Sequence, residues 1–347
     1  MRILFASTHK YLPELHGGME INTHQLATRL LSAGISVGVL VGLEGRGRVG
    51  TLAKLQMKML GRKWGRDHVM GYPVWRTYDP SAVADFVVDE FKPDAVVVQG
   101  GHEFIKLVSG FIKRKLPVIG YLHSHDRLLL DVDLSREGRL VFMVNSKFTA
   151  SMHPEKRIVR VLPPIVPRRL YETETDRTAA VLINPSKYKG LDVVMGMARA
   201  RPDIPFHLVM TKKKQRLEIE KLPNITITGP FDDMRKVYRN ARVVLAPSQC
   251  DETWGRIATE AHVSGIPVLA STRGGLLEAV GPGGICLPHN SLNEEWVAAL
   301  GKMWDDPHHY AQLSAAAADY AKRREIQPDA LVNGFVEEVC AHVERVT

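Results

Sequence analysis

The strongest constraint on the fold is an alternation of short β-rich runs with helical segments, which recurs in both halves of the chain. Such alternation is typical of parallel α/β sheets, because parallel strands need a crossover connection that is usually a helix. The expected strands are Ile3–Ala6, Val37–Val41, Ala95–Val98, Val118–Leu122 and Val141–Val144 in the first half, and Val181–Ile183, Phe206–Met210, Ile225–Thr228, Val243–Ala246 and Val268–Ala270 in the second.

Helical segments separate these runs. We expect helices at Glu20–Ser32, Ala82–Phe91 and Phe104–Lys115, and after about Asn290 the chain is predicted to be wholly helical, ending in Asp329–Val346. In sheets of this kind ligands bind beyond the carboxyl ends of the strands. The loops that follow strands are therefore where functional residues are expected.

The alternation breaks once, at Leu162–Arg177 (LPPIVPRRLYETETDR), which is rich in proline and charge. This composition indicates a linker between two domains. We predict two Rossmann-like α/β domains that face each other across a cleft, at residues 1–164 and 179–325, with a linker at 165–178. Residues 326–347 are predicted as a C-terminal helical tail, for which packing back on the first domain is one option.

The composition is that of a soluble globular protein, since 45% of the 347 residues are hydrophobic and 24% are charged. No apolar run approaches the ~20 residues that a membrane-spanning helix needs. The N-terminal sequence MRILFASTHK enters a strand pattern directly, without the apolar stretch of a secretory signal. The cysteines show no metal-ligand or disulfide spacing. We expect a cytoplasmic location.

Positive charge is concentrated in the first half: residues 1–165 hold 23 Lys and Arg against 15 Asp and Glu, whereas residues 166–347 hold 23 of each. The segment Thr51–Arg66 (TLAKLQMKMLGRKWGR) has five basic residues and no acid. As a helix it would have an apolar stripe with basic flanks, formed by Leu52, Leu55, Met59 and Leu60 and by Lys54, Lys58, Arg62 and Lys63. Two interpretations stay open: peripheral contact with an anionic membrane surface, and a solvated helix whose stripe packs on its own domain. Nucleic acid is not expected as a partner, because no nucleic-acid-binding module accompanies the charge.

The most specific motif is Cys250–Pro267 (CDETWGRIATEAHVSGIP), where Glu252 and Glu260 are eight positions apart. Gly255 lies between them, at the start of a predicted helix. Free N–H groups at such a start favour an anion such as a diphosphate. Glu260 is placed to accept hydrogen bonds from a ribose diol and Glu252 from sugar hydroxyls. A capping acid and a helix-surface glutamate are the structural alternative.

This segment resembles the E-x7-E region of retaining glycosyltransferase family 4, whose members have a GT-B fold. The downstream sequence SGIPVLASTRGGLLEAVGPGG resembles the strand and Gly-Gly-x-x-Glu loop of that family, and a first strand followed by Gly17–Gly18 and a helix matches its N-terminus. The resemblance spans nearly the whole chain in the expected order. It implies a GT-B fold in which the first domain faces the acceptor and the second binds a nucleotide sugar, with no cofactor and no metal.

The resemblance also implies roles for single residues. Glu260 corresponds to the acid that binds the donor ribose, and Glu252 to the acid that contacts the donor sugar near its reacting face. The remaining implied donor contacts are loop residues: Gly17 and Gly18 near the donor phosphates, Gly274, Gly275 and Glu278 under the donor, and Gly229 beside the nucleobase.

One expected phosphate-binding residue is missing. The family usually has an arginine and a lysine in the loop after the first strand of the second domain, and this chain reads INPSKYKG over Ile183–Gly190. Lys189 fits the lysine position, but Asn184 stands where spacing would put the arginine. Lys187 or Arg256 would be the available substitutes.

His123 ends the predicted strand PVIGYLH and resembles the cleft histidine of the family, which supports the donor sugar or the reaction centre. A structural histidine is the alternative. The next polar residues, His125 and Asp126, are candidates for facing the acceptor. Ser146 is a weaker acceptor candidate, with a helix N-cap as an equal alternative.

Several other enzyme classes are disfavoured. The chain has no G-x-G-x-x-G after its first strand and no G-x-x-x-x-G-K-[ST], which argues against dinucleotide oxidoreductases and P-loop nucleotidases. It has no G-x-S-x-G hydrolase elbow. The predicted function is therefore metal-independent, retaining hexosyl transfer from a UDP- or GDP-sugar to a glycan, lipid-linked or small-molecule acceptor, in surface polysaccharide or glycoconjugate biosynthesis. The alternatives are a non-catalytic nucleotide-sugar-binding protein and a GT-B nucleotide-sugar epimerase.

Overall fold

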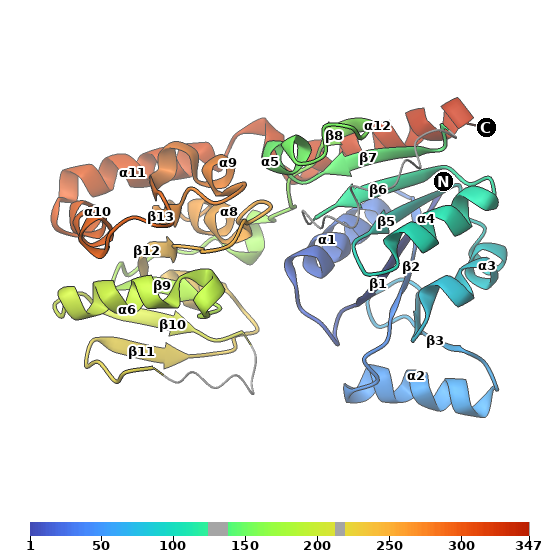
Figure 1. Ribbon diagram of the computed structural model, residues 1–347, viewed down its shortest axis with the longest axis horizontal. Coiled ribbons are helices and arrows are strands. Elements are labelled where there is room, and N and C mark those ends of the chain that lie inside the picture. Colours follow the sequence, from blue (N-terminus) through green and yellow to red (C-terminus); the bar gives the residue numbers. More distant parts are fainter. Residues whose placement is uncertain (124–137, 212–218, 347) are drawn as a thin grey trace. The chain divides into compact units, whose positions relative to one another are not determined.

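The computed structural model describes residues 1–123, 138–211 and 219–346, and Figure 1 shows the course of the chain. The chain divides into two compact units: unit 1 comprises Met1–Ile165 with Pro328–Thr347, and unit 2 comprises Val166–Gln327. Each unit has its own sheet of mainly parallel strands with helices packed on it. The predicted α/β class with two sheet-containing domains is confirmed.

The described strands of unit 1 form one sheet in the order β3-β4-β2-β1-β5-β6-β7-β8. Neighbours are parallel except for the antiparallel pair β3–β4. The strands are β1 (Arg2–Lys10), β2 (Ser36–Gly42), β3 (Trp64–Asp67), β4 (Val74–Thr77), β5 (Ala95–Gln99), β6 (Val118–Leu122), β7 (Leu140–Val144) and β8 (Ile158–Val161). Strands β5, β6 and β7 are buried along their whole length, as expected for a parallel sheet covered on both faces.

Helices cover both faces of this sheet. On one face lie α1 (Gly18–Ser32) and α12 (Pro328–Val346), and the Phe335 ring of α12 stacks on Phe5 of β1 with a centroid distance of 6.1 Å. On the other face lie α3 (Pro80–Phe91) and α4 (Phe104–Lys113). The C-terminal helix therefore completes the core of unit 1, although it follows unit 2 in the sequence.

Two further helices belong to unit 1. The helix α5 (Lys147–Ser151) connects β7 to β8. The helix α2 (Gly47–Met59) lies beside β3, the edge strand of the sheet, at the margin of unit 1 in Figure 1.

Unit 2 has a sheet of described strands in the order β11-β10-β9-β12-β13-β14, with all neighbours parallel. The strands are β9 (Ala179–Ile183), β10 (Phe206–Val209), β11 (Ile225–Thr228), β12 (Ala241–Ala246), β13 (Val268–Ser271) and β14 (Gly284–Leu287). Its helices are α6 (Leu191–Ala200), α7 (Arg235–Arg239), α8 (Arg256–His262), α9 (Leu276–Val280), α10 (Asn293–Asp305) and α11 (Pro307–Tyr320), with 3-10 turns η3 (Arg168–Leu170), η4 (Lys187–Lys189), η5 (Gly281–Gly283) and η6 (Arg324–Ile326).

Every strand expected from the apolar runs is present, most of them longer than the run itself. The apolar pattern does not predict β3, β4, β8 and β14. Each of these strands has four residues, and β3 (WGRD), β4 (VWRT) and β8 (IVRV) include charged residues. Their extended conformation depends on pairing with a neighbouring strand rather than on local sequence.

Residues 51–66 do not form one helix, which corrects the expectation for this segment. The helix α2 ends at Met59 and β3 begins at Trp64. Gly61 adopts a left-handed φ of 60°, and the Arg62 N–H donates to the Met57 carbonyl at 3.1 Å. This is a Schellman ending, for which glycine is favoured because it has no Cβ.

The predicted linker at 165–178 packs largely as part of unit 2. Val166 and Tyr171 lie in the hydrophobic core of that unit, and η3 forms between them. The stretch is therefore packed up to Tyr171, whereas residues 172–178 are exposed or half-buried. No helix in the described part of the chain is long and apolar enough to cross a membrane.

Candidate functional site

In unit 2, Lys189 and Glu252 form an ion pair beyond the carboxyl ends of β9 and β12. Lys189 ends the turn η4, and Glu252 lies in the loop between β12 and α8. Glu252 Oε1 accepts hydrogen bonds from the Lys189 ammonium and, at 2.7 Å, from the Ser248 hydroxyl. The two side chains are 31% and 19% exposed, so both are accessible to a ligand. The sequence names both residues, and the structure brings them into contact.

The loop that carries Glu252 is held by two glycines. Glu252 forms a β-bridge with Gly274, and the Gly275 N–H donates to the Glu252 carbonyl at 2.6 Å. Gly274 has a φ of 63°, and a Cβ there would collide with the Glu252 carbonyl oxygen. Only glycine fits this position, for both conformational and steric reasons. The predicted residues Glu252, Gly274 and Gly275 therefore form one backbone-supported loop.

Glu260 lies inside α8, which begins directly after Gly255 as predicted. Its side chain is largely buried, and each carboxylate oxygen has a partner. Tyr238 donates its hydroxyl to Oε2 at 2.8 Å, and Arg256 donates Nε–H to Oε1 at 2.6 Å. Burial raises the pKa of Tyr238 well above its usual value, so its hydroxyl stays protonated as a donor.

Arg256 is bound to Glu260 and Tyr171 rather than open to a phosphate. Its side chain is 11% exposed, and Nη2 donates to the Tyr171 hydroxyl at 3.0 Å. The expectation that Arg256 could replace the missing arginine is therefore not met in this conformation. Its buried Nη1 has no hydrogen-bond partner among the described residues. Lys187, the other substitute, is exposed on η4.

Asn184 occupies a backbone conformation that explains the departure at this position. It directly follows β9 with a φ of 60°, its N–H donates to the Val209 carbonyl at 2.8 Å, and Oδ1 accepts from the Thr211 hydroxyl at 3.1 Å. Asparagine is several-fold enriched in the left-handed region. The side chain therefore fastens the loop before η4, on which Lys189 lies.

The remaining donor candidates of unit 2 also lie in loops or at helix starts. Gly229 follows β11 with a φ of 103°, and a Cβ there would collide with the Met210 carbonyl oxygen. Glu278 lies in the first turn of α9, three residues after Gly275. Its carbonyl accepts hydrogen bonds from Tyr320 and Arg323. Both positions are consistent with supporting roles.

In unit 1, Gly17 and Gly18 lie between β1 and α1, as predicted. Gly17 is the N-cap of α1, and Glu20 folds back so that backbone N–H groups of Gly17 and Glu20 bind its carboxylate. Glu20 is largely buried, and burial raises its pKa. A Cβ on Gly17 would collide with the Glu20 carboxylate, whereas a Cβ on Gly18 would meet no atom within 4 Å. The two glycines therefore have different local constraints.

His123 directly follows β6 and is partly exposed, at the carboxyl edge where β1 and β5 also end. Its Nε2 lies 3.1 Å from Gln99 Nε2, and Gln99 Oε1 accepts from the Thr23 hydroxyl at 2.7 Å. Tyr121 packs against the imidazole with a centroid distance of 4.0 Å. Desolvation of the imidazole by the residues around it lowers the pKa of His123 to about 3, so the ring is neutral at physiological pH. A neutral imidazole positioned in this way can hydrogen-bond a sugar hydroxyl.

The acceptor candidates have different outcomes. Ser146 is fully buried, and its hydroxyl accepts from the Thr149 N–H at 2.8 Å as the N-cap of α5. The capping alternative is therefore correct, and Ser146 is not placed to contact an acceptor. His125 and Asp126 lie outside the described residues. Among the residues that the structure describes, no group of three or more His, Cys, Asp and Glu side chains is arranged to hold a metal ion.

Several residues around these sites are absent from the sequence predictions. They position the predicted residues: Ser248 binds Glu252, Tyr238 and Tyr171 complete the Glu260 cluster, Gln99 and Thr23 orient His123, and Glu20 shapes the Gly17 loop. Gln99 had one usable indication, since it directly follows the expected strand Ala95–Val98. Tyr238, Tyr171 and Thr23 act through contacts between distant segments, whereas Ser248 and Glu20 lie only a few positions from the residues they bind.

The family model described as glycosyl transferases group 1 matches residues 185–306. This range contains Lys189, Glu252, Glu260 and the Gly274–Gly275 loop. The chain therefore contains a glycosyl transferases group 1 domain, and most of the unit 2 site lies within it.

Curated relatives carry the description D-inositol 3-phosphate glycosyltransferase. The protein of Corynebacterium aurimucosum is 31% identical over 127 residues, which are 36% of this chain and 29% of that protein. The protein of Mycolicibacterium gilvum is 28% identical over 265 residues, which are 74% of this chain and 54% of that protein. The chain thus matches about half or less of the length of these relatives.

Solved structures resemble nearly the whole chain. A glycosyltransferase of Rickettsia africae has a TM-score of 0.75 at 12% identity, with 99% of this chain and 98% of that chain covered. The sucrose-phosphate synthase of Thermosynechococcus elongatus has a TM-score of 0.75 at 16% identity and 98% coverage of both chains. Anabaena HepE in complex with UDP-glucose has a TM-score of 0.73 at 18% identity, covering 98% of this chain and 100% of that chain. These likenesses confirm the expected GT-B fold.

Proposed function

We propose, from the glycosyl transferases group 1 domain and the GT-B fold, that this chain is a retaining, metal-independent hexosyltransferase with a nucleotide-diphosphate sugar as donor. The observation that carries the proposal is the Lys189–Glu252–Ser248 cluster on its glycine-supported loop. It offers a cation for a diphosphate, Lys189, in direct contact with a carboxylate for sugar hydroxyls, Glu252. Anabaena HepE, a GT-B neighbour, binds UDP-glucose, which supports a UDP-sugar as the first donor to test.

The proposed chemistry is a front-face substitution. The bond between the anomeric carbon and the leaving phosphate oxygen breaks, and the acceptor hydroxyl attacks the same face. Its proton passes to the leaving phosphate oxygen. Charge builds on the diphosphate as the bond breaks, so a cation placed there lowers the barrier. Lys189 supplies that cation, while Glu252 and His123 hold the sugar hydroxyls.

The cluster at Glu260 is assigned to the nucleoside. Glu260 Oε1 and Oε2 each have one partner, and a carboxylate oxygen has capacity for a second donor such as a ribose hydroxyl. The unpaired, buried Arg256 Nη1 supports a polar ligand nearby, because a buried N–H without a partner costs about 1–3 kcal/mol. The glycines Gly17, Gly18 and Gly229 are assigned to backbone contacts with the phosphates and the base.

The acceptor is proposed to be a glycan, a lipid-linked saccharide or a small molecule of surface polysaccharide or glycoconjugate biosynthesis. The description of the curated relatives names D-inositol 3-phosphate, which is a hydroxylated, anionic molecule. An anionic acceptor suits the basic unit 1 sequence. A cytoplasmic location is part of the same proposal.

Thermal unfolding with UDP, GDP, ADP, CDP and dTDP, each with and without EDTA, tests the donor site. A nucleotide at about 100 times its Kd should add roughly 2.7 kcal/mol of stability. We expect a clear shift with one nucleotide that EDTA does not change. The matching nucleotide sugar should then be turned over with release of the diphosphate, and NMR of the product should show the anomeric configuration of the donor.

Other outcomes of these experiments would favour the alternative functions or a different mechanism. Stabilisation by a nucleotide sugar without diphosphate release would indicate a binding protein. Conversion of the donor sugar to its epimer without an acceptor would indicate an epimerase. An inverted product would contradict the front-face mechanism. A shift that EDTA abolishes would contradict metal independence.

A further inference from the structure

The helix α2 exposes its apolar stripe to solvent. Leu52, Leu55, Met59 and Leu60 are 47%, 50%, 73% and 61% exposed. The buried residues of α2 are Gly50 and Ala53, whose small side chains form the face against unit 1. The stripe therefore does not pack on its own domain, which excludes the structural interpretation that the sequence left open.

This concentration of exposed apolar residues is unusual within the chain. Of the fourteen large hydrophobic residues that are exposed in the described structure, four lie between positions 52 and 60. Leu52, Leu55 and Met59 have the spacing i, i+3, i+7, which places side chains on one face of a helix. Single exposed apolar residues need no explanation, but a contiguous row rimmed by polar residues marks an interaction surface.

The charges beside the stripe are of one sign. Lys54 and Lys58 are exposed and one helical turn apart on the same flank, and the exposed Lys63 follows the helix end. The segment Thr51–Arg66 contains no acid. Arg62, expected on this face, instead stacks on Trp64 with its guanidinium carbon 3.6 Å from the ring centroid.

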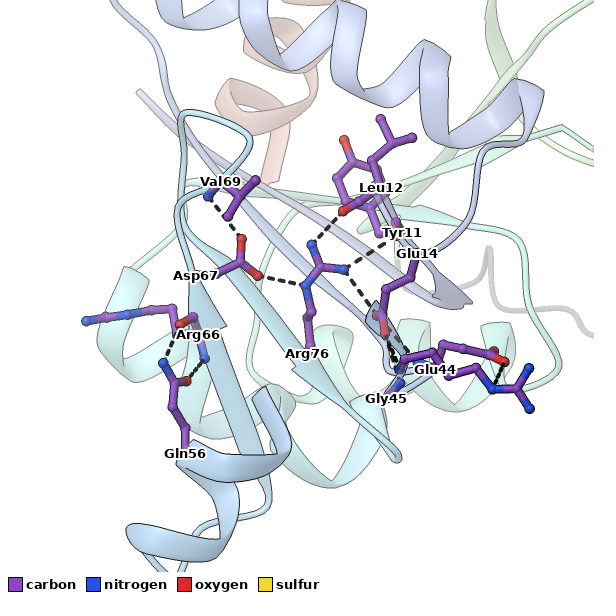
Figure 2. Close-up of polar contacts among 11 residues, drawn as sticks. Tyr11, Leu12, Glu14, Glu44, Gly45, Gln56, Arg66, Asp67, Val69 and Arg76 are labelled. Atoms are coloured by element: carbon purple, nitrogen blue, oxygen red, sulfur yellow. Dashed lines mark hydrogen bonds and ion pairs between the residues drawn. The ribbon is translucent and has the colours of Figure 1, made fainter. Parts of the chain in front are cut away.

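The helix is attached to unit 1 at both ends (Figure 2). At its start, the Glu14 carboxylate accepts from the Gly45 N–H at 2.8 Å and the Arg46 N–H at 3.3 Å. Nearer its end, the Gln56 amide bonds both the N–H and the carbonyl of Arg66 on β3, at 2.8 and 3.1 Å. These hydrogen bonds hold α2 in place on unit 1, with its apolar stripe facing solvent.

Glu14 is itself held by a buried cation. Arg76 on β4 is fully buried, and its guanidinium lies 3.5 Å from Glu14 and 2.7 Å from Asp67, while Nη2 donates to the Leu12 carbonyl at 2.5 Å (Figure 2). Leu12 and Glu14 belong to the segment that leads from β1 to Gly17. The N-terminal end of α2 is thus connected, through Glu14 and Arg76, to the segment that precedes Gly17.

We propose that α2 docks on a lipid bilayer containing anionic lipids, lying in the plane of the interface with its stripe among the acyl chains. An apolar face flanked by lysines is complementary to such a surface, because the acyl region takes the leucines and the anionic headgroups take the lysines. The proposal stands independently of donor chemistry. Docking there places the Glu14 loop close to the headgroups, where a lipid-linked acceptor would be presented.

Sedimentation of the full chain with vesicles tests this proposal. The vesicles are phosphatidylcholine alone and an equal mixture of phosphatidylcholine and phosphatidylglycerol. We expect binding to the mixed vesicles that weakens as salt is raised. Lys54→Gln with Lys58→Gln should weaken it about thirtyfold, because a lysine near an anionic surface contributes about 1 kcal/mol. Leu52→Gln with Leu55→Gln and Met59→Gln should lower it about hundredfold or more.

Matched controls lie elsewhere on the chain. Leu277→Gln changes a leucine that is 51% exposed in unit 2, and Lys113→Gln with Lys302→Gln removes two exposed lysines. Both controls should sediment like the wild type. Equal sedimentation of the stripe variant and the wild type, or no binding by the wild type, would overturn the proposal. Loss of a dimer in the stripe variant, without a change in vesicle binding, would assign the surface to self-association instead. An unchanged nucleotide-induced thermal shift in every variant separates this test from that of the donor site.

Discussion

The Lys189 ammonium and the Glu252 carboxylate form an ion pair across 63 positions of sequence. Each residue lies beyond the end of a different parallel strand, β9 and β12, and these strands are neighbours in the sheet. The pair joins a group that suits phosphate to a group that suits sugar hydroxyls. In the ligand-free chain each charge balances the other, and an incoming diphosphate would compete with Glu252 for Lys189.

A double-mutant cycle on this pair tests its role in turnover. Lys189→Met and Glu252→Gln should each lower kcat/KM by about 10²–10³, since removing one preorganised charge or donor typically costs that much. The double variant should lose less than the product of the two, because contacting residues are coupled. Lys302→Met, at an exposed lysine of α10, is the control and should stay near the wild type. Strictly multiplicative losses would mean that the two side chains act separately.

Removal of Arg256 should destabilise unit 2. Arg256 and Glu260 are 11% and 7% exposed, and Arg256→Met would leave Glu260 as a buried charge without its cation. Breaking a buried pair in this way costs about 3–5 kcal/mol. Urea unfolding measures the loss, and Arg239→Met is the control, because Arg239 is 64% exposed in its contact with Asp176. A loss below about 1 kcal/mol for Arg256→Met would show that the pair adds no net stability.

The variant Gly18→Ala tests whether the backbone at Gly18 contacts the donor, because the added methyl group has no effect on packing in the free chain. A Cβ at Gly18 meets nothing within 4 Å, so the thermal stability of the free chain should stay within about 0.5 kcal/mol of the wild type. If the backbone there approaches the donor phosphates, the same methyl group should raise the donor KM about tenfold. Steady-state kinetics and a melting curve on one preparation decide the matter. An unchanged KM would remove Gly18 from the donor contacts.

Acid should weaken the fold through the fully buried His262, whose pKa is lowered to about 3 by burial and by Arg323. Below the ordinary value of 6.5 the unfolded chain takes up a proton and the folded chain does not, so stability falls as the pH falls. Between about pH 7.5 and about pH 5 this contributes a loss of about 2 kcal/mol. The loss should be smaller by that amount in His262→Leu.

Urea unfolding at the two pH values measures this difference, and the exposed His308→Leu serves as the control. Comparing two pH values within one variant cancels any constant effect of the substitution on packing. An identical pH dependence of the free energy of unfolding in His262→Leu and the wild type would contradict the prediction.

Regular, strongly periodic segments could be predicted from the sequence. Strand β6 and helix α12 are examples, because their apolar residues recur at a fixed spacing. Short strands such as β3 were not, since a Trp-Gly-Arg-Asp sequence becomes extended only by pairing with β4. Gly61 indicated in the sequence that α2 ends there. The basic and apolar pattern of Thr51–Arg66 instead suggested a helix over the whole segment.

For the site, the spacing of Glu252 and Glu260 left two interpretations open, and the family resemblance selected these residues together with Gly274 and Gly275 as donor-site candidates. Which side chains meet was decided by tertiary structure. Tyr238 binds Glu260, Gln99 lies against His123, and Lys189 pairs with Glu252, each across a large separation in sequence. Parallel strands bring their carboxyl ends together only once the sheet has formed. The desolvation that keeps the His123 ring neutral and the exposure that leaves Leu55 in solvent likewise follow from packing, which no local pattern encodes.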